Sequence, residues 1–162
     1  MDKEILLDFD GVILDSMVRI EEYMKIHEHE ISWKEYLINL DWYKFLRECK
    51  EINNSISLIR KMQYCSCLKA IITKINSMNE GTNKIKFLQE QGIYIPVILV
   101  PFEHKKTDYY YPNNNEILVD DSIDNIREWN EAGGLGILFD LNSSKKDTNS
   151  ISNLNKVLKK SR

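Results

Sequence analysis

The chain has 162 residues, of which 43% are hydrophobic, 10% aromatic and 29% charged. This length suits a single domain with at most one inserted substructure, and the composition favours a folded chain over a disordered one. The formal net charge of -3 is small and mixed in sign. It therefore gives no support for a broad basic surface that binds a nucleic-acid polymer.

The sequence contains no apolar run approaching the roughly 20 residues that span a bilayer, and its first residues do not resemble a signal peptide. The three cysteines, Cys49, Cys65 and Cys67, are an odd number, which favours reduced thiols over a disulfide framework. Cys65-Ser66-Cys67 could ligate a metal, but no second cysteine or histidine cluster completes a tetrahedral site, so partly buried thiols are the simpler interpretation. We expect a cytoplasmic protein without a membrane partner. A monomer and a homo-oligomer both stay open.

The first predicted element is a buried strand over residues 4–10, a short apolar run without a helical stripe that ends at acids and Gly11. Residues 17–63 carry long helical periodicity instead, through positions such as Ile20 and Leu40. We interpret this segment as a helical insertion that follows the first strand.

Short strands and helices alternate in the rest of the chain. Helices are predicted over residues 79–91 and 123–132, each followed by glycine. Apolar segments rich in β-branched residues predict strands over residues 68–73, 94–100, 116–119 and 136–139. This alternation predicts βαβ units and therefore an α/β fold with a doubly wound parallel sheet.

The segment after Asp140, rich in Asn, Ser and Lys, predicts a polar loop that leads into a last short amphipathic helix containing Ile151, Leu154 and Val157. We expect this tail to pack on the edge of the sheet. The predicted organisation is a core of residues 1–16 and 64–162, with residues 17–63 as a helical cap.

Acidic side chains stand where two of the predicted strands end. Asp8 and Asp10 end the first strand, and Asp120 and Asp121 follow a later one. In an open α/β sheet, ligands bind beyond the carboxyl ends of the strands. Like charges about 4 Å apart repel by roughly 4 kcal/mol at an effective dielectric near 20, so a divalent cation is the natural partner for these acids. Oxygen ligands without a histidine or cysteine cluster indicate Mg²⁺.

The segment from Leu6 to Ser16, LLDFDGVILDS, resembles the first signature of the haloacid dehalogenase-like superfamily, which is dominated by phosphatases. Ile71-Ile72-Thr73 is similar to its second motif, a strand ending in Thr or Ser. Lys105 or Lys106 resembles the third motif, and Ile117 to Ser122, ILVDDS, resembles the fourth. The resemblance covers nearly all of the predicted sheet domain and implies a Rossmann-like core.

The resemblance implies a magnesium-dependent phosphatase with a role for each matching residue. Asp8 would attack phosphorus and form an aspartyl-phosphate. Asp10 would protonate the leaving group and then activate water. Mg²⁺ would be held by Asp8, the backbone carbonyl of Asp10 and Asp121, with Asp120 behind them. Thr73 and a lysine would bind the phosphoryl oxygens.

Each of these signals has a simpler interpretation when it is taken alone. An Asp-x-Asp-Gly sequence is often a turn, Thr73 is an ordinary strand residue, and paired acids can cap a helix. Their order at the ends of predicted strands favours catalysis. Of the two lysines we prefer Lys106. Asn76 and Ser77 could also reach the phosphate, although a polar turn before a helix explains them equally well.

In the resembled family, a helical insertion between the first two motifs forms a cap that selects the leaving group. The aromatic residues of this insertion could stack on a nucleobase, although cap core is the simpler interpretation. The short cap and the Asp-Asp-Ser sequence look similar to the 5'(3')-deoxyribonucleotidase branch, which implies a small nucleoside monophosphate as substrate. The longer, polar link over residues 109–115 departs from that branch.

Two alternatives stay open, and a third is disfavoured. A sugar phosphate or another small metabolite could be the substrate instead of a nucleotide. The chain could be a non-catalytic regulatory module that binds Mg²⁺ and phosphate. A dehalogenase is disfavoured, because a halide leaves without a proton and Asp10 would have no task.

Overall fold

A computed structural model describes residues 3–27, 30–142 and 149–160 of the chain. Its centre is a parallel sheet in the order β3-β2-β1-β4-β5-β6, so the predicted α/β fold with a doubly wound parallel sheet is confirmed. The strands are β1 (Glu4–Leu7), β2 (Leu68–Ile75), β3 (Val97–Pro101), β4 (Glu116–Asp120), β5 (Leu135–Phe139) and β6 (Ser150–Ile151).

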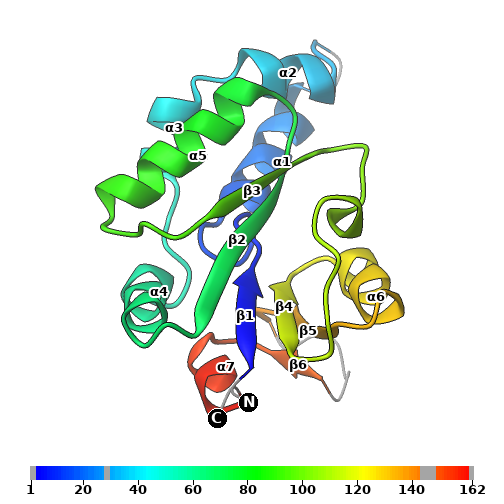
Figure 1. Ribbon diagram of the computed structural model, residues 1–162. Coiled ribbons are helices and arrows are strands. Elements are labelled where there is room, and N and C mark those ends of the chain that lie inside the picture. Colours follow the sequence, from blue (N-terminus) through cyan, green and yellow to red (C-terminus); the bar gives the residue numbers. More distant parts are fainter. Residues whose placement is uncertain (1–2, 28–29, 143–148, 161–162) are drawn as a thin grey trace.

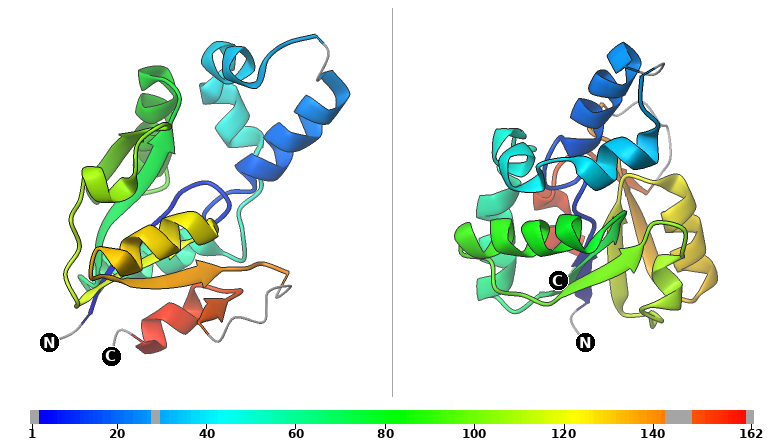
Figure 2. Two further views of the ribbon diagram at one scale, coloured as in Figure 1. Left: turned by 90° about the vertical axis from the view of Figure 1, so that its right-hand side faces the viewer. Right: turned by 90° about the horizontal axis from the view of Figure 1, so that it is seen from above.

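Helices cover both faces of this sheet because the strand residues are apolar on both sides. Ile5 and Leu7 of β1 join one buried cluster, whereas Leu6 between them joins the other. The first cluster includes residues of α4 (Ser55–Tyr64), α5 (Met78–Glu90) and α7 (Asn155–Lys160), and the second includes α6 (Ile123–Glu131). Figure 2 shows α6 and α7 on opposite sides of β5.

Local sequence signals set the ends of α5 and α6, the helices predicted over residues 79–91 and 123–132. The hydroxyl of Ser77 accepts a hydrogen bond from the amide of Glu80 at the start of α5, and Ser122 caps α6 in the same way through Asn125. Gly92 and Gly133, just past the two helices, have positive φ angles, which glycine adopts without strain. Both helices lie within one residue of their predicted bounds.

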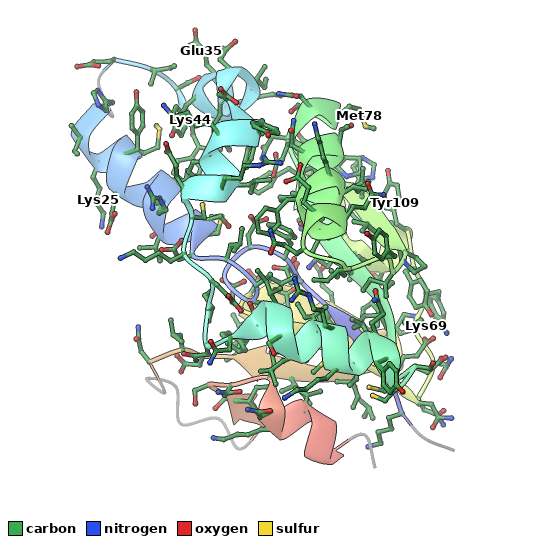
Figure 3. All side chains as sticks on the ribbon, turned by 90° about the vertical axis from the view of Figure 1, so that its left-hand side faces the viewer. Lys25, Glu35, Lys44, Lys69, Met78 and Tyr109 are labelled. Atoms are coloured by element: carbon green, nitrogen blue, oxygen red, sulfur yellow. The ribbon has the colours of Figure 1, made fainter. Side chains whose placement is uncertain are left out.

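The described residues of the predicted insertion between β1 and β2 form four helices. They are α1 (Ser16–His27), α2 (Trp33–Asn39), α3 (Trp42–Glu48) and α4. β1 points toward α1, α2 and α3, which lie beyond the carboxyl end of the sheet, whereas α4 lies beside the strands (Figure 1). Figure 3 shows α3 next to α5, with Met78 at the amino end of α5. The division into core and cap at residues 16/17 and 63/64 stays a prediction.

Several sequence expectations about element boundaries were wrong, among them the start of the strand predicted over residues 94–100, which lies at Val97. The strand predicted over residues 4–10 ends at Leu7, because Phe9 to Leu14 form a loop in which the amide of Ile13 donates to the carbonyl of Phe9. Ile151 lies in β6 and pairs with Phe139 instead of starting a helix. The tail packs on the sheet edge as expected. The middle of its predicted polar loop, residues 143–148, lies outside the described residues.

Within the described part of the chain, no helix is long and apolar enough to cross a membrane. The three cysteines are free thiols. The cytoplasmic location stays a prediction.

Candidate active site

The order of the strands creates a topological switch point between β1 and β4, where the chain runs to β2 on one side and returns as β4 on the other. Asp8 directly follows β1, and Asp121 directly follows β4. Leu7 is in register with Val119, whose carbonyl accepts the amide hydrogen of Asp8 at 2.9 Å. The register therefore brings the two acidic segments together at the carboxyl edge of the sheet.

Three carboxylates converge at this edge. Asp8, Asp120 and Asp121 each place an oxygen within 4.8 Å of the others. The loop after β1 approaches Asp121 so closely that a Cβ atom on Gly11 would lie 2.1 Å from Asp121 Oδ2, and Gly11 has a φ of +76°. Only glycine fits this position without displacing the carboxylate. The convergence predicted from the strand ends is thus present in the fold.

The buried ammonium of Lys106 joins two of these acids. Lys106 Nζ lies 2.7 Å from Asp8 Oδ1 and 2.5 Å from Asp120 Oδ2, and Lys106 is only 2% exposed. Asp120 also accepts hydrogen bonds from the amide of Ser122 and from the side chain of Asn125. Both oxygens of Asp120 therefore have protein donors, so this residue orients Lys106 and the turn into α6.

Adjacent Lys105 points away from the site. Its side chain is 58% exposed and lies 3.7 Å from Glu128 on α6. The short 3-10 helix η1 (Lys106–Asp108) begins between the two lysines and turns their side chains in different directions. Of the two predicted lysines, the structure brings Lys106 to the acids and leaves Lys105 at the surface.

The Asp10 side chain lines the same cleft but is held by a different set of donors. Ser16 Oγ donates to Asp10 Oδ1 at 2.6 Å, and Lys84 Nζ donates to Asp10 Oδ2 at 2.6 Å. Among the described residues, the group of acids that could share a cation contains Asp8, Asp120 and Asp121 and does not contain Asp10. A metal-binding role for Asp10 would thus have to use its backbone carbonyl.

Thr73 does not reach the cleft. Its side chain is fully buried, and its hydroxyl accepts a hydrogen bond from Lys84 Nζ at 3.1 Å. The physical reason is the length of β2, which continues to Ile75 and ends two residues beyond the predicted boundary. Asn76, the first residue after β2, lines the cleft at the place predicted for Thr73.

Two buried residues on α5 were not predicted as part of the site. Lys84 Nζ lies 2.7 Å from Glu80 Oε1, and Glu80 Oε2 accepts the amide hydrogen of Asn76 at 2.8 Å. In sequence, Glu80 and Lys84 look like an exposed helical ion pair. Buried Leu88 lies eight residues after Glu80 and four residues after Lys84. This spacing indicates that both charged side chains lie on the buried face of the helix.

No protein-family model matches this chain, and no curated protein matches it in sequence. Solved structures do match over almost its whole length. A HAD hydrolase from Bacillus subtilis bound to magnesium is 13% identical with a TM-score of 0.69, covering 98% of this chain and 97% of that one. A haloacid dehalogenase-like protein from Streptococcus pneumoniae is 13% identical with a TM-score of 0.67, covering 99% of each chain. A phospho-aspartyl intermediate analogue of phosphoserine phosphatase is 15% identical with a TM-score of 0.53, covering 98% of each chain.

The chain has the fold of the haloacid dehalogenase-like (HAD) hydrolases. The parallel sheet and the acidic cluster beyond β1 and β4 agree with the resemblance seen in the sequence. None of the three structures is named as a deoxyribonucleotidase, and that branch of the superfamily stays a prediction.

The acids of this HAD fold open into a cleft of about 340 Å³. Its floor is polar, and its walls come from α1, α2, α3 and the segment after β3. The residues on the floor are Asp8, Asp10, Lys74, Asn76, Glu80, Lys106, Asp121, Ser122 and Asn125, and those on the walls are Met17, Ile20, Glu21, Trp33, Leu37, Trp42 and Phe102. The cleft therefore combines an anion-handling floor with largely apolar walls.

Burial and mutual repulsion disfavour full ionisation of the acids. Burial, followed by the Asp120 carboxylate, raises the pKa of Asp8 well above its usual value, although Lys106 opposes the shift. Burial, Asp120 and Asp10 raise the pKa of Asp121 to about 7. Burial acts against the charge of Lys106, but Asp120 and Asp8 together raise its pKa above the usual value. If all three acids were ionised, their negative charge would exceed the positive charge of Lys106, which fits a divalent cation held by carboxylate oxygens.

The Asp121 carboxylate should make the stability of the metal-free protein depend on pH. Its folded-state pKa of about 7 lies above its ordinary value of 3.8. The folded state therefore binds more protons between these values, and the stabilisation present below the lower pKa is lost as pH rises through the higher one. We expect the Tm difference between Asp121→Asn and wild type to grow in favour of the variant from pH 5 to pH 8.

Mg²⁺ at about a hundred times its Kd should raise the wild-type Tm by about 5–10 °C at pH 8. The rise should be smaller at pH 5, where protonated Asp121 is a poorer ligand. Asp121→Asn should lose most of the effect. Thermal unfolding with Mg²⁺ and with Na⁺ at equal ionic strength measures both expectations, and an equal Mg²⁺ shift in wild type and variant would contradict them.

Proposed function

We propose that this protein is a magnesium-dependent phosphomonoesterase that acts through a phosphorylated Asp8. The observation that carries the proposal is the placement of Asp8. Its carboxylate is held by Lys106 at 2.7 Å, beside Asp121, at the floor of a cleft large enough for a small ester. A buried carboxylate with a fixed orientation is suited to attack phosphorus in line with a leaving group above it.

The donor set fits Mg²⁺, a hard cation that prefers carboxylate and carbonyl oxygens. Asp8, Asp121 and the backbone carbonyl of Asp10 would hold the ion, while Asp120 is committed to Lys106, Ser122 and Asn125. When bound, the cation would neutralise the repulsion between the anionic attacker and the anionic ester.

The side chains of the floor have separate tasks in this proposal. Asp8 forms a bond to phosphorus as the bond to the leaving oxygen breaks, and Asp10 gives its proton to that oxygen. Asp10 then takes a proton from the water that attacks the aspartyl-phosphate. Lys106 keeps the Asp8 carboxylate oriented and places positive charge beside the phosphoryl oxygens. Asn76 replaces Thr73 as the phosphate contact from the end of β2, because Asn76 lines the cleft and Thr73 does not.

The likeness to known structures supports the same chemistry by analogy. One similar structure contains bound magnesium, and another is an analogue of a phospho-aspartyl intermediate of phosphoserine phosphatase. These properties belong to those proteins, and the low sequence identity transfers the fold alone.

For the substrate, we propose a small ester with a planar or apolar leaving group, with a nucleoside monophosphate as the first class to test. Trp33 and Phe102 on the walls offer aromatic surface, and Met17 and Ile20 add apolar surface. Glu21 is a charged wall residue that could bind polar groups of the leaving group. In this proposal residues 17–63 act as the cap that selects the leaving group. A sugar phosphate would find fewer polar partners on these walls.

The experiment is a phosphate-release screen with wild type and Asp8→Asn over nucleoside monophosphates, sugar phosphates and an aryl phosphate, each with Mg²⁺ and with EDTA. We expect release by wild type with Mg²⁺ alone, fastest with a nucleoside monophosphate. Fastest release from a sugar phosphate would overturn only the substrate class. If wild type released no phosphate while Mg²⁺ still raised its Tm, the chain would be a binding module and the catalytic proposal would be wrong.

A further inference from the structure

Lys84 is the one fully buried lysine that the proposed mechanism does not use among the described residues. It lies in the middle of α5, the helix whose amino end Met78 marks in Figure 3. Its ammonium lies 2.6 Å from Asp10 Oδ2, 2.7 Å from Glu80 Oε1, 3.1 Å from Thr73 Oγ1 and 3.2 Å from the carbonyl of Lys74. A lysine ammonium has three hydrogens to donate, so these acceptors occupy it completely. Lys84 thus has no donor left for a substrate.

The two oxygens of Asp10 are held unequally. Oδ2 lies 2.6 Å from Lys84 Nζ and 3.4 Å from the Thr73 hydroxyl, both of which are buried inside the fold. The partner of Oδ1 is the hydroxyl of Ser16 at 2.6 Å. A charge-assisted bond to a buried ammonium is stronger than a bond to a rotating hydroxyl. Oδ1 can therefore exchange its partner more easily than Oδ2.

Glu80 fixes Lys84 from the opposite side. Glu80 lies four residues before Lys84 on α5 and accepts a hydrogen bond from Lys84 through Oε1. Its other carboxylate oxygen, Oε2, accepts the amide hydrogen of Asn76 at 2.8 Å. The ion pair is 0% and 4% exposed at its two side chains, so water does not weaken it. This network ties the orientation of Asp10 to the end of β2, where Asn76 lines the cleft.

We propose that Lys84 is a positioning residue for acid catalysis, which anchors Asp10 Oδ2 so that Oδ1 is the oxygen that serves the leaving group. This inference rests on the proposed phosphatase activity. As the P–O bond breaks, the proton on Asp10 Oδ1 moves to the leaving oxygen. In the second step Oδ1 takes a proton from the attacking water as the new P–O bond forms and the bond from phosphorus to Asp8 breaks. Lys84 touches neither the substrate nor the phosphoryl group.

The test is the dependence of the rate on the leaving group. An alkoxide leaving group needs a proton from Asp10, whereas dinitrophenolate leaves without one. Lys84→Met should lower kcat/KM by about 10²-fold on the nucleoside or sugar phosphate that wild type hydrolyses fastest. On dinitrophenyl phosphate it should lower kcat/KM only a few-fold. Asp10→Asn should show the same pattern in this first step, measured as the burst of dinitrophenolate. Lys86→Met, on the exposed side of the same helix, is the matched control and should match wild type.

A second variant covers the case in which Lys84→Met fails to fold because two buried acids lose their partner. Thr73→Val keeps the ion pair and removes one donor to Asp10 Oδ2 and one acceptor of Lys84. It should reduce turnover of the alkyl ester by about 5-fold, with little effect on dinitrophenyl phosphate.

Equal losses on both esters, in whichever of these two variants folds, would show a merely structural role and overturn the inference. Wild type that is inactive on both esters would contradict the proposed function itself, and the role of Lys84 with it.

Discussion

Replacing Lys106 by methionine should destabilise the folded protein by about 3–5 kcal/mol and lower turnover by about 10²–10³-fold. Lys106 is 2% exposed, and its ammonium contacts both Asp8 and Asp120. Its loss would leave two buried carboxylates facing each other without a cation. The stability change should appear as a Tm lowered by about 10 °C, measured without metal.

Lys105→Met provides a matched control at the next position. The Lys105 side chain is 58% exposed and its carboxylate neighbour, Glu128, is 3.7 Å away, so its removal should change stability by less than about 0.5 kcal/mol. Both variants lose the same charge and gain the same side chain. Equal effects of the two substitutions on Tm and on turnover would mean that the buried contacts of Lys106 contribute nothing.

Asp8→Asn should abolish turnover, by about 10⁴-fold or more, without lowering the Tm of the metal-free protein at neutral pH. An amide cannot attack phosphorus. Burial and the Asp120 carboxylate already raise the pKa of Asp8 well above its usual value, so the ionised form is disfavoured in the fold. Removing one of the crowded charges therefore relieves repulsion, while Asp120 still pairs with Lys106. A loss of activity without a loss of stability is typical of a residue in an active site.

Asp124→Asn is the control for this second prediction. Asp124 is also an acid close to the end of β4, but its side chain is 67% exposed on α6 and does not line the cleft. Phosphate release and thermal unfolding are measured for wild type, Asp8→Asn and Asp124→Asn. The turnover and Tm of Asp124→Asn should match those of wild type. Full turnover by Asp8→Asn would show that Asp8 is not the nucleophile.

The acids beyond β1 and β4 could be predicted from the sequence because apolar runs stop there, although β1 itself ends three residues before its predicted boundary. Asp8 and Asp121 follow these strands, and the parallel register then forces them together. The end of β2 could not be predicted as well. Thr73-Lys74-Ile75 continues the strand, and whether a polar residue ends a strand or is buried in it depends on neighbours that the sequence does not display. For Thr73 that neighbour is Lys84.

The buried position of Lys84 could not be predicted from the sequence either. A Glu and a Lys four residues apart on a helix usually stabilise an exposed face, and here the same spacing forms a buried ion pair. What decides is the acceptor opposite the helix, Asp10, which is 74 residues away in the chain. β6 is a similar case, because Ile151 extends the sheet by pairing with Phe139 of β5. Long-range partners, not local pattern, determine these outcomes.

Asp8 should carry the phosphoryl group during turnover. Asp10→Asn makes this visible, since a good leaving group such as dinitrophenolate departs without an acid while the second step lacks its base. Acid quench of Asp10→Asn with Mg²⁺ and dinitrophenyl phosphate, followed by peptide mass spectrometry, should find one added phosphoryl group on Asp8. Release of inorganic phosphate by wild type, with Asp8 of the variant always unmodified, would contradict the account.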